Sequence, residues 1–275
     1  MIVAGKAFAA ERREELLKQR SAFDALSLGV VMGEHDPVTS SFVRVKERNA
    51  EMLGVTLVRY LIPEGASTEA VQKLLEDAAK EDGIIVQLPL PDGVDTEAVL
   101  ASIPPEKDVD ALSPEMNDRL SVGDVSIVPP VAAAVREILA AHNISVSGKE
   151  IAIVGKGKLV GVPCAALFKT LGGKVTMLDK KDNLESLKTA DIVMLGAGSP
   201  HLVKRDMVQD GVVILDAGTS EQAGVVVGDA DPTVAEKASF FTPVPGGVGP
   251  MTIACLLRNT VTAFCRQNGY PEPDM

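Results

Sequence analysis

The stretch from Ile151 to Gly161 most narrowly limits how this 275-residue chain can fold. Its β-branched apolar run, Ile151 to Val154, predicts a buried strand, and a helical pattern begins near Gly161. Between them lie Gly155 and Gly157, so the spacing is G-x-G-x-x-x-G. A strand, a glycine turn and a helix together present free backbone N–H groups to a pyrophosphate. The alternative is a tight turn without a ligand, because a glycine string alone is weak evidence.

Three further apolar runs follow the turn, at residues 174–178, 190–195 and 211–216. Asp179 stands at the end of the first, 24 residues after Gly155. That is close to the roughly 20 residues at which an acid meets the adenosine ribose. Gly198 and Gly218 follow the second and third runs. Strands that alternate with helices and end in glycine predict a Rossmann-type parallel sheet with a dinucleotide at the strands' carboxyl ends.

Composition excludes several other classes of function. The net charge of −11 and the pI of about 4.8 oppose binding to nucleic acid and to anionic membranes. The sequence contains no run of 18 apolar residues and no basic-then-apolar beginning, so we expect no membrane span and a cytoplasmic protein. Three cysteines without C-x-x-C spacing and three unpaired histidines predict neither disulfides nor a metal site.

The first half of the chain also reads as an α/β sheet. Apolar runs at 26–32, 55–61 and 83–88 predict strands, with helices at 39–53 and 67–80 between them and a surface helix within 1–20. A fourth strand is expected shortly before Asp110. We therefore predict an α/β fold of two domains, with residues 1–125 forming the first and 126–249 the second. A helix over 250–270 is expected to complete the first domain.

Three polar residues of the first half are candidates for acid–base chemistry. Lys46 lies within a predicted helix, Gln87 ends a predicted strand, and Asp110 leaves the following loop. A lysine half buried beside an amide and a carboxylate can exchange a proton near neutral pH. The alternatives are a solvated helix residue for Lys46 and a loop cap for Asp110. Gln87 stands between apolar neighbours, so its amide needs a partner if buried.

Four segments of the chain carry specific motifs. They are Val86-Gln-Leu-Pro-Leu-Pro91, Lys107-Asp-Val-Asp110, Lys158-Leu-Val-Gly-Val-Pro163 and Thr242-Pro-Val-Pro-Gly-Gly-Val-Gly-Pro-Met-Thr252. In this order, and over residues 29–261, the chain resembles the bifunctional methylenetetrahydrofolate dehydrogenase/cyclohydrolase family. The resemblance implies two α/β domains around a cleft, in a homodimer. It also implies oxidation of 5,10-methylenetetrahydrofolate with NADP or NAD, then hydrolysis of the methenyl product to 10-formyltetrahydrofolate.

The resemblance also implies roles for individual residues. Lys46 would be the general acid/base of hydrolysis, Gln87 would hold that lysine, and Asp110 would bind the pterin edge. Further folate contacts are implied for Phe42, Gly246, Gly247 and Pro250. The implied dinucleotide contacts are Gly155, Lys156, Gly157, Val160, Gly161, Asp179, Lys180, Gly198 and Gly218.

Several motif positions depart from the family pattern. Phe42 replaces a tyrosine and so lacks the hydroxyl, which puts the hydrolytic step more in question than the oxidation. Ala111 replaces a glycine, and Lys156-Gly157 replace arginine and serine at the phosphate turn. These departures keep three readings open: both activities, a dehydrogenase without cyclohydrolase, or a diverged relative with another substrate or only a binding role.

The dinucleotide's identity depends on the segment Asp179-Lys180-Lys181-Asp182, where the family has H-S-R-T. A carboxylate at Asp179 would bond the ribose 2′-hydroxyl of NAD and repel the 2′-phosphate of NADP. Lys156, Lys180 and Lys181 could offset that repulsion, but without the bidentate geometry of arginine. The balance favours NAD.

Overall fold

The structure is a computed structural model that describes residues 1–275 apart from 4, 21–24, 34–36, 124–126, 223–224 and 274–275, and apart from the side chains of 37–42. The chain divides into two compact units. Unit 1 consists of Met1–Ala10, Leu120–Gly123 and Val131–Thr252, and unit 2 of Glu11–Arg119, Asp124–Pro130 and Ile253–Met275. Residues 1–10 thus lie in the unit of the glycine turn, not in the domain predicted to begin at residue 1. The backbone explains this, because Val3 N donates to Phe241 O at 3.0 Å and Phe241 N to Met1 O at 2.9 Å.

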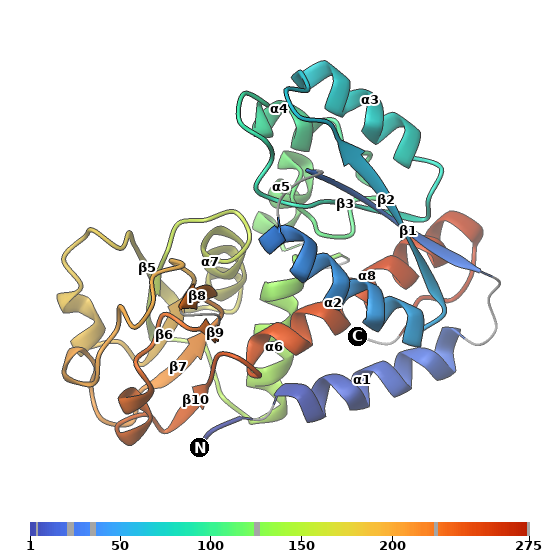
Figure 1. Cartoon of the computed structure of the whole chain (residues 1–275). Coiled ribbons are helices and arrows are strands. Elements are labelled where there is room, and N and C mark those ends of the chain that lie inside the picture. The colour runs from blue at the N-terminus through green and yellow to red at the C-terminus, as the bar shows by residue number, and fades with distance from the viewer. Residues whose placement is uncertain (4, 21–24, 34–36, 124–126, 223–224, 274–275) are drawn as a thin grey trace. The chain divides into compact units, whose positions relative to one another are not determined.

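Unit 1 is organised around a parallel sheet with strand order β10-β7-β6-β4-β5 (Figure 1). The strands are β4 (Glu150–Val154), β5 (Lys174–Leu178), β6 (Ile192–Leu195), β7 (Val213–Asp216) and β10 (Phe240–Thr242). β4, β6 and β7 are buried along almost their whole length, as expected for central strands of a parallel sheet covered on both faces. The predicted parallel α/β sheet is confirmed.

The other elements of unit 1 include two helices, α6 (Pro130–Ala141) and α7 (Gly161–Thr170). Three short 3-10 helices are η1 (Glu185–Lys188), η2 (Arg205–Met207) and η3 (Pro232–Glu236). A two-stranded antiparallel hairpin pairs β8 (Ser220–Gln222) with β9 (Val225–Val227). The hairpin, the 3-10 helices and β10 were not predicted, because segments of three to five residues are too short to show a hydrophobic period.

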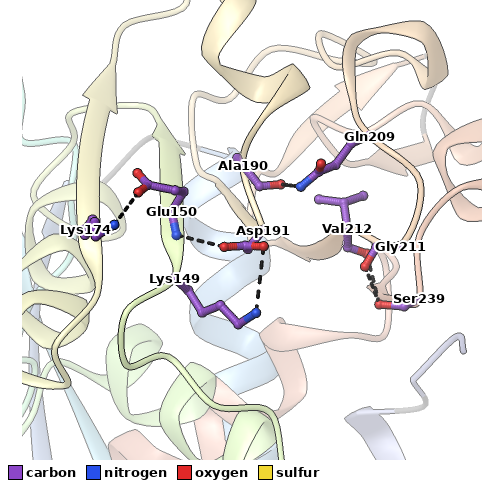
Figure 2. Close-up of polar contacts among 9 residues, drawn as sticks. All are labelled: Lys149, Glu150, Lys174, Ala190, Asp191, Gln209, Gly211, Val212 and Ser239. Carbon is purple, nitrogen blue, oxygen red and sulfur yellow. Dashed lines mark hydrogen bonds and ion pairs between the residues drawn. The ribbon is translucent and has the colours of Figure 1, made fainter.

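Polar contacts tie the loops together at the amino ends of the unit 1 strands (Figure 2). The Asp191 carboxylate, just before β6, accepts from Glu150 N at 3.0 Å and lies 3.8 Å from Lys149 Nζ. Lys174 Nζ pairs with Glu150 Oε1 at 2.7 Å across β4 and β5. Such exposed ion pairs contribute little to stability, because water screens both charges. They lie at the amino ends of the strands, whereas the glycine turns follow the carboxyl ends.

Unit 2 contains a smaller parallel sheet with strand order β2-β1-β3 (Figure 1). Its strands are β1 (Leu26–Gly33), β2 (Val55–Ile62) and β3 (Gly83–Val86). The predicted fourth strand before Asp110 is wrong: in the described chain it is reduced to one bridge between Ile84 and Asp108. The chain turns away there, because Ser113 N donates back to the Asp108 carboxylate at 2.8 Å.

Four helices accompany this sheet in the described part of unit 2: α2 (Pro37–Met52), α3 (Thr68–Ala78), α4 (Thr96–Ala101) and α5 (Pro114–Ser121). The predicted stop after α2 is confirmed, since Gly54 has a φ of +63°. Ser67 caps α3, because its Oγ accepts from Ala70 N at 3.3 Å.

Helices α1 (Gly5–Arg20) and α8 (Val248–Asn268) each begin in unit 1 and continue into unit 2. α8 buries Leu256, Leu257 and Val261 in the core cluster that includes Leu28 of β1. It begins two residues before the helix predicted over 250–270 and ends two residues before its predicted end. Ahead of α8, Thr242 ends β10, and Gly246 has a φ of +107°, which is not a helical conformation.

α8 is long and apolar enough to cross a membrane by length and composition alone. However, 67% of its most apolar window is buried inside the protein. Asn259 lies within it, and its Nδ2 donates to Val109 O and Val128 O, each at 2.9 Å. α8 therefore has the contacts of a core helix, which passes the same test of length and hydropathy.

Candidate active site

The glycine turn directly follows β4, at the carboxyl end of the unit 1 sheet. Gly155 has a φ of +111°, and a Cβ there would lie 2.3 Å from Gly196 O. A Cβ on Gly161 would lie 1.9 Å from Gly155 O. These two glycines are therefore required by backbone packing. A Cβ on Gly157 would meet no atom within 4 Å, so the space beside the exposed Gly157 is open to a ligand.

The start of α7 fits an anionic ligand. Its N-cap is Val160, whose side chain makes no capping hydrogen bond. Val160 instead packs on the next loop, since a Cβ on Gly196 would lie 2.3 Å from Val160 Cγ1. The free N–H groups of a helix's first turn and its dipole favour a phosphate. The predicted dinucleotide turn thus has open space at Gly157 and an uncapped helix start.

The segment after β5 brings two carboxylates close to the glycine turn. Asp182 Oδ2 accepts from Asp179 N at 2.7 Å and from Lys156 Nζ at 3.2 Å. These donors lower the pKa of the Asp182 carboxyl. Asp179 is half-buried and accepts from Lys181 N at 3.3 Å. The charge of Lys156, which lies in the turn, is therefore already paired with Asp182.

Gly198 and Gly218 lie where predicted, in the loops after β6 and β7, but each is bonded to a buried carboxylate. Gly198 N donates to Asp229 Oδ2 at 3.1 Å, and Gly218 N to Asp216 Oδ1 at 2.9 Å. Burial, followed by the nearby charge of Asp229, raises the pKa of Asp216 to about 7 against its backbone donors. Burial also raises the pKa of Asp229, which the field of Lys180 opposes.

These two carboxylates were not among the predicted site residues. The available signal is that Asp216 ends a buried strand and Asp229 follows the apolar run Val225–Val227. Ligands of open α/β sheets bind at the carboxyl ends of the parallel strands, which is where Asp216 lies. Their partners are backbone N–H groups, which a sequence does not display.

In unit 2 the structure brings the predicted lysine, amide and acid together. Lys46 Nζ of α2 donates to Gln87 Oε1 at 2.9 Å. Gln87 is fixed in turn, because its Nε2 donates to Leu88 O at 3.1 Å and its backbone N to Val31 O at 2.9 Å. Burial raises the pKa of Asp110, and the positive charge of Lys46 opposes that rise. The Lys46 side chain is thus fixed by a hydrogen bond to Gln87 and is not simply solvated.

The neighbours of Asp110 hold the loop in a strained shape. Asp108 is buried, and its carboxylate accepts from Leu112 N at 3.2 Å and Ser113 N at 2.8 Å. Between them Ala111 adopts a φ of +52°. Phe42 lies on α2 one turn before Lys46, but its side chain is outside the described part of the structure.

The remaining predicted residues lie in the loop between β10 and α8 and in the first turn of α8. Gly246 has a φ of +107°, and Gly247 N donates to Pro243 O at 2.8 Å. A Cβ on Gly247 would lie 2.6 Å from Pro243 O, so the loop has no room for a side chain there. Pro250 lies in the first turn of α8.

Within the described residues, no group of three or more His, Cys, Asp or Glu side chains could hold a metal ion. A parallel sheet with a glycine turn in one unit, and a held lysine, amide and acid in the other, define an α/β enzyme that uses a dinucleotide.

Comparison with known proteins identifies the family. Residues 3–110 match the tetrahydrofolate dehydrogenase/cyclohydrolase catalytic domain, and residues 129–268 match that family's NAD(P)-binding domain. Bifunctional protein FolD of Methanospirillum hungatei is 42% identical over 98% of this chain and 99% of its own length. The crystal structure of the bifunctional enzyme FolD from Campylobacter jejuni has a TM-score of 0.91 at 34% identity, covering 97% of this chain and 99% of that one.

The FolD of Trypanosoma brucei, solved with NADP and an inhibitor, also has a TM-score of 0.91, at 31% identity over 98% of each chain. This chain belongs to the tetrahydrofolate dehydrogenase/cyclohydrolase family. The resemblance inferred from the motifs is confirmed. The chain is accordingly an NAD(P)-dependent methylenetetrahydrofolate dehydrogenase and methenyltetrahydrofolate cyclohydrolase of one-carbon metabolism.

Proposed function

We propose that Lys46, Gln87 and Asp110 carry the hydrolytic half of this bifunctional activity. The hydrogen bond from Lys46 Nζ to Gln87 Oε1 is the observation that carries the proposal. Gln87 cannot swing away, since its own amide and backbone are bonded, so it fixes the position of Nζ. A positioned amine can give or take the proton of the attacking water. Asp110, with its raised pKa, then serves as a hydrogen-bond partner for the polar edge of the pterin.

The oxidation step requires fewer catalytic groups from the protein than the hydrolysis step. A bound nicotinamide supplies the hydride acceptor. The folate contacts implied by the resemblance are Phe42 and Asp110 in unit 2 and Gly246, Gly247 and Pro250 in unit 1. Close backbone packing at Gly247 keeps the shape of its loop. Positioning of this kind needs no protein base. Loss of Lys46 should therefore affect the two activities unequally.

The test supplies methylenetetrahydrofolate with NAD or NADP and follows the absorbance of the methenyl product and its decay. Lys46→Ala should slow the decay by about 100-fold or more, the usual loss for a general acid/base, and leave measurable oxidation. Arg48→Ala, an exposed position on the same helix, is the control and should change neither rate. Unchanged hydrolysis in Lys46→Ala would remove Lys46 from this role.

We also propose that NAD is the preferred dinucleotide. Asp179 and Asp182 place two carboxylates after β5, where a 2′-phosphate would meet them. Lys156 offers little compensation, because its Nζ is paired with Asp182 at 3.2 Å. Parallel measurement of kcat/KM should show a preference for NAD, reduced in Asp179→Asn. A higher kcat/KM with NADP in the unaltered protein contradicts the proposal.

The assembly that we propose is a homodimer, as the family resemblance implies, and the location that we propose from the composition is the cytoplasm. The buried cysteines Cys164, Cys255 and Cys265 form no disulfide among the described residues, which suits a reducing compartment. Light scattering after size exclusion gives the mass in solution, and a mass of 28.9 kDa, that of one chain, would exclude the dimer.

A further inference from the structure

The loops after β6 and β7 are held by a pair of buried carboxylates. Asp229 is fully buried. Its Oδ2 accepts from Ala197 N at 2.6 Å and Gly198 N at 3.1 Å, and its Oδ1 from Ser199 N at 2.6 Å. Three consecutive N–H groups thus converge on one carboxylate, and the backbone of the loop after β6 curls around it.

Asp216 holds Asp229 in place. Its Oδ2 accepts from Ala230 N at 2.8 Å and its Oδ1 from Asp229 N at 3.3 Å. Its own backbone N donates to Thr242 Oγ1 at 2.8 Å, at the end of β10. Asp216 therefore connects the segment that carries Asp229 to the start of the Thr242–Gly247 loop.

The space around the pair is fitted to carboxylates. A Cβ on Gly218 would lie 2.2 Å from Asp229 Cγ, and a Cβ on Gly228 would lie 2.2 Å from Asp216 Oδ2. Two glycines are thus required to admit the two acids. Burying charge in this way is unfavourable without strong partners, so an apolar packing of the same volume would be the simpler means of stabilising a fold.

The loop held by Asp229 adjoins the glycine turn. A Cβ on Gly155 would lie 2.5 Å from Gly196 C and 2.8 Å from Ala197 N, so the two backbones are in contact. β6 is also the direct neighbour of β4, the strand that leads into the turn. A shift of the 197–199 loop would therefore change the surface next to the turn on which the dinucleotide is proposed to lie.

We propose that Asp229, held by Asp216, is a positioning residue for the dinucleotide: its carboxylate fixes the Ala197–Ser199 loop against the glycine turn. This inference rests on the proposed use of that turn by NAD or NADP. Asp229 is not a catalytic residue, since it is buried and acts through the backbone of the loop. Its loss should weaken dinucleotide binding and leave the hydrolytic residues of unit 2 unaffected.

The test uses Asp229→Asn, which keeps the shape but replaces one acceptor oxygen by a donor facing the same N–H groups. The KM for NAD, and its Kd by calorimetry without folate, should rise about 10-fold or more, as for the weakening of one charge-assisted hydrogen bond. Hydrolysis of supplied methenyltetrahydrofolate needs no dinucleotide. Its rate should therefore stay within about 2-fold of that of the unaltered protein, well below a tenfold change. Asp231→Asn, at a half-buried residue nearby that caps η3, is the matched control and should change neither.

Two results would overturn the proposal: an unchanged Kd for NAD in folded Asp229→Asn, or an equal loss of dinucleotide binding and hydrolysis, which indicates a general structural role. If Asp229→Asn does not fold, Asp216→Asn is measured in the same way, with a smaller but equally selective rise in the Kd expected. Failure of the proposed function is distinguishable, because the unaltered protein would then bind neither NAD nor NADP.

Discussion

Ala111 has a backbone conformation that side chains rarely adopt, with a φ of +52° in a buried loop. The left-handed region costs an L-residue about 1–2 kcal/mol, whereas glycine enters it freely. Ala111→Gly should therefore raise the free energy of unfolding by up to about 1 kcal/mol after the entropy of the new glycine is subtracted. Urea unfolding measures the change.

A matched control for this substitution lies in α6. Ala133 is also buried but sits inside a helix, so Ala133→Gly should lower the free energy of unfolding by about 1 kcal/mol. If Ala111→Gly lowers the free energy of unfolding as much as Ala133→Gly does, the left-handed conformation of Ala111 is not a source of strain.

Asp216 should make stability depend on pH. Its folded pKa of about 7 lies above the ordinary aspartate value of 3.8, so the folded state keeps a proton that the unfolded state releases. The stabilisation is complete below pH 3.8 and is lost as the pH rises toward 7. The shift corresponds to on the order of 4 kcal/mol over that range.

Denaturant unfolding at pH 5 and pH 7.5 measures this contribution. Asp216→Asn should flatten the decline in unfolding free energy that the unaltered protein shows between these values. Asp231→Asn should keep the decline, because the pKa of Asp231 is lowered below 3.8 and it does not titrate in this range. An unchanged slope in Asp216→Asn would show that another group carries the proton.

Among the elements, α3 offers a direct test of capping. Ser67 accepts from Ala70 N at 3.3 Å and satisfies one of the unpaired donors of the helix start. Ser67→Ala should lower the free energy of unfolding by about 1 kcal/mol, whereas Ser67→Asp should preserve it, since both serine and aspartate cap well. Thermal unfolding compares the three proteins, and equal stability of the alanine variant would rule out the cap as a source of stability.

Elements with long apolar runs were predictable from the sequence, and short ones were not. β4, β6 and β7 are buried on both faces, so their apolar runs are continuous and easily recognised. The strand predicted before Asp110 is only a bridge at Asp108, because the bonds to the Asp108 carboxylate end the pairing. Hydrogen bonds of side chains and backbone determine where such short elements begin and end, and these bonds cannot be seen in a pattern of residue types.

In the candidate site, too, some contacts were predictable from the sequence and others were not. The contact between Lys46 and Gln87 was expected from motifs 41 residues apart, whose meaning came from the family resemblance. The part played by Asp229 could not be predicted, since its three partners are backbone N–H groups of a loop about 30 residues earlier in the chain. The pairing of Lys156 with Asp182 was missed for a similar reason: it depends on how two loops approach.

At the scale of the whole molecule, each unit has a core of its own. Ile214 belongs to a cluster formed by unit 1 strands, and Leu28 to a cluster formed by unit 2 elements, including α8. Ile214→Ala and Leu28→Ala should each cost about 2–5 kcal/mol, from the lost contacts and the cavity left behind. Hydrogen exchange should show faster opening mainly in β7 for the first and in β1 for the second. Equal acceleration of both strands would mean that the two units open as one.

The division of α8 between the units has a consequence for how the chain is made. Unit 2 takes residues 11–119 together with 253–275, and the latter include Leu256, Leu257 and Val261 of its core. On a ribosome, residues 11–119 emerge well before these partners, while every strand of the unit 1 sheet lies before residue 253. The unit whose strands emerge first is therefore finished second, and its apolar core stays incomplete throughout that interval.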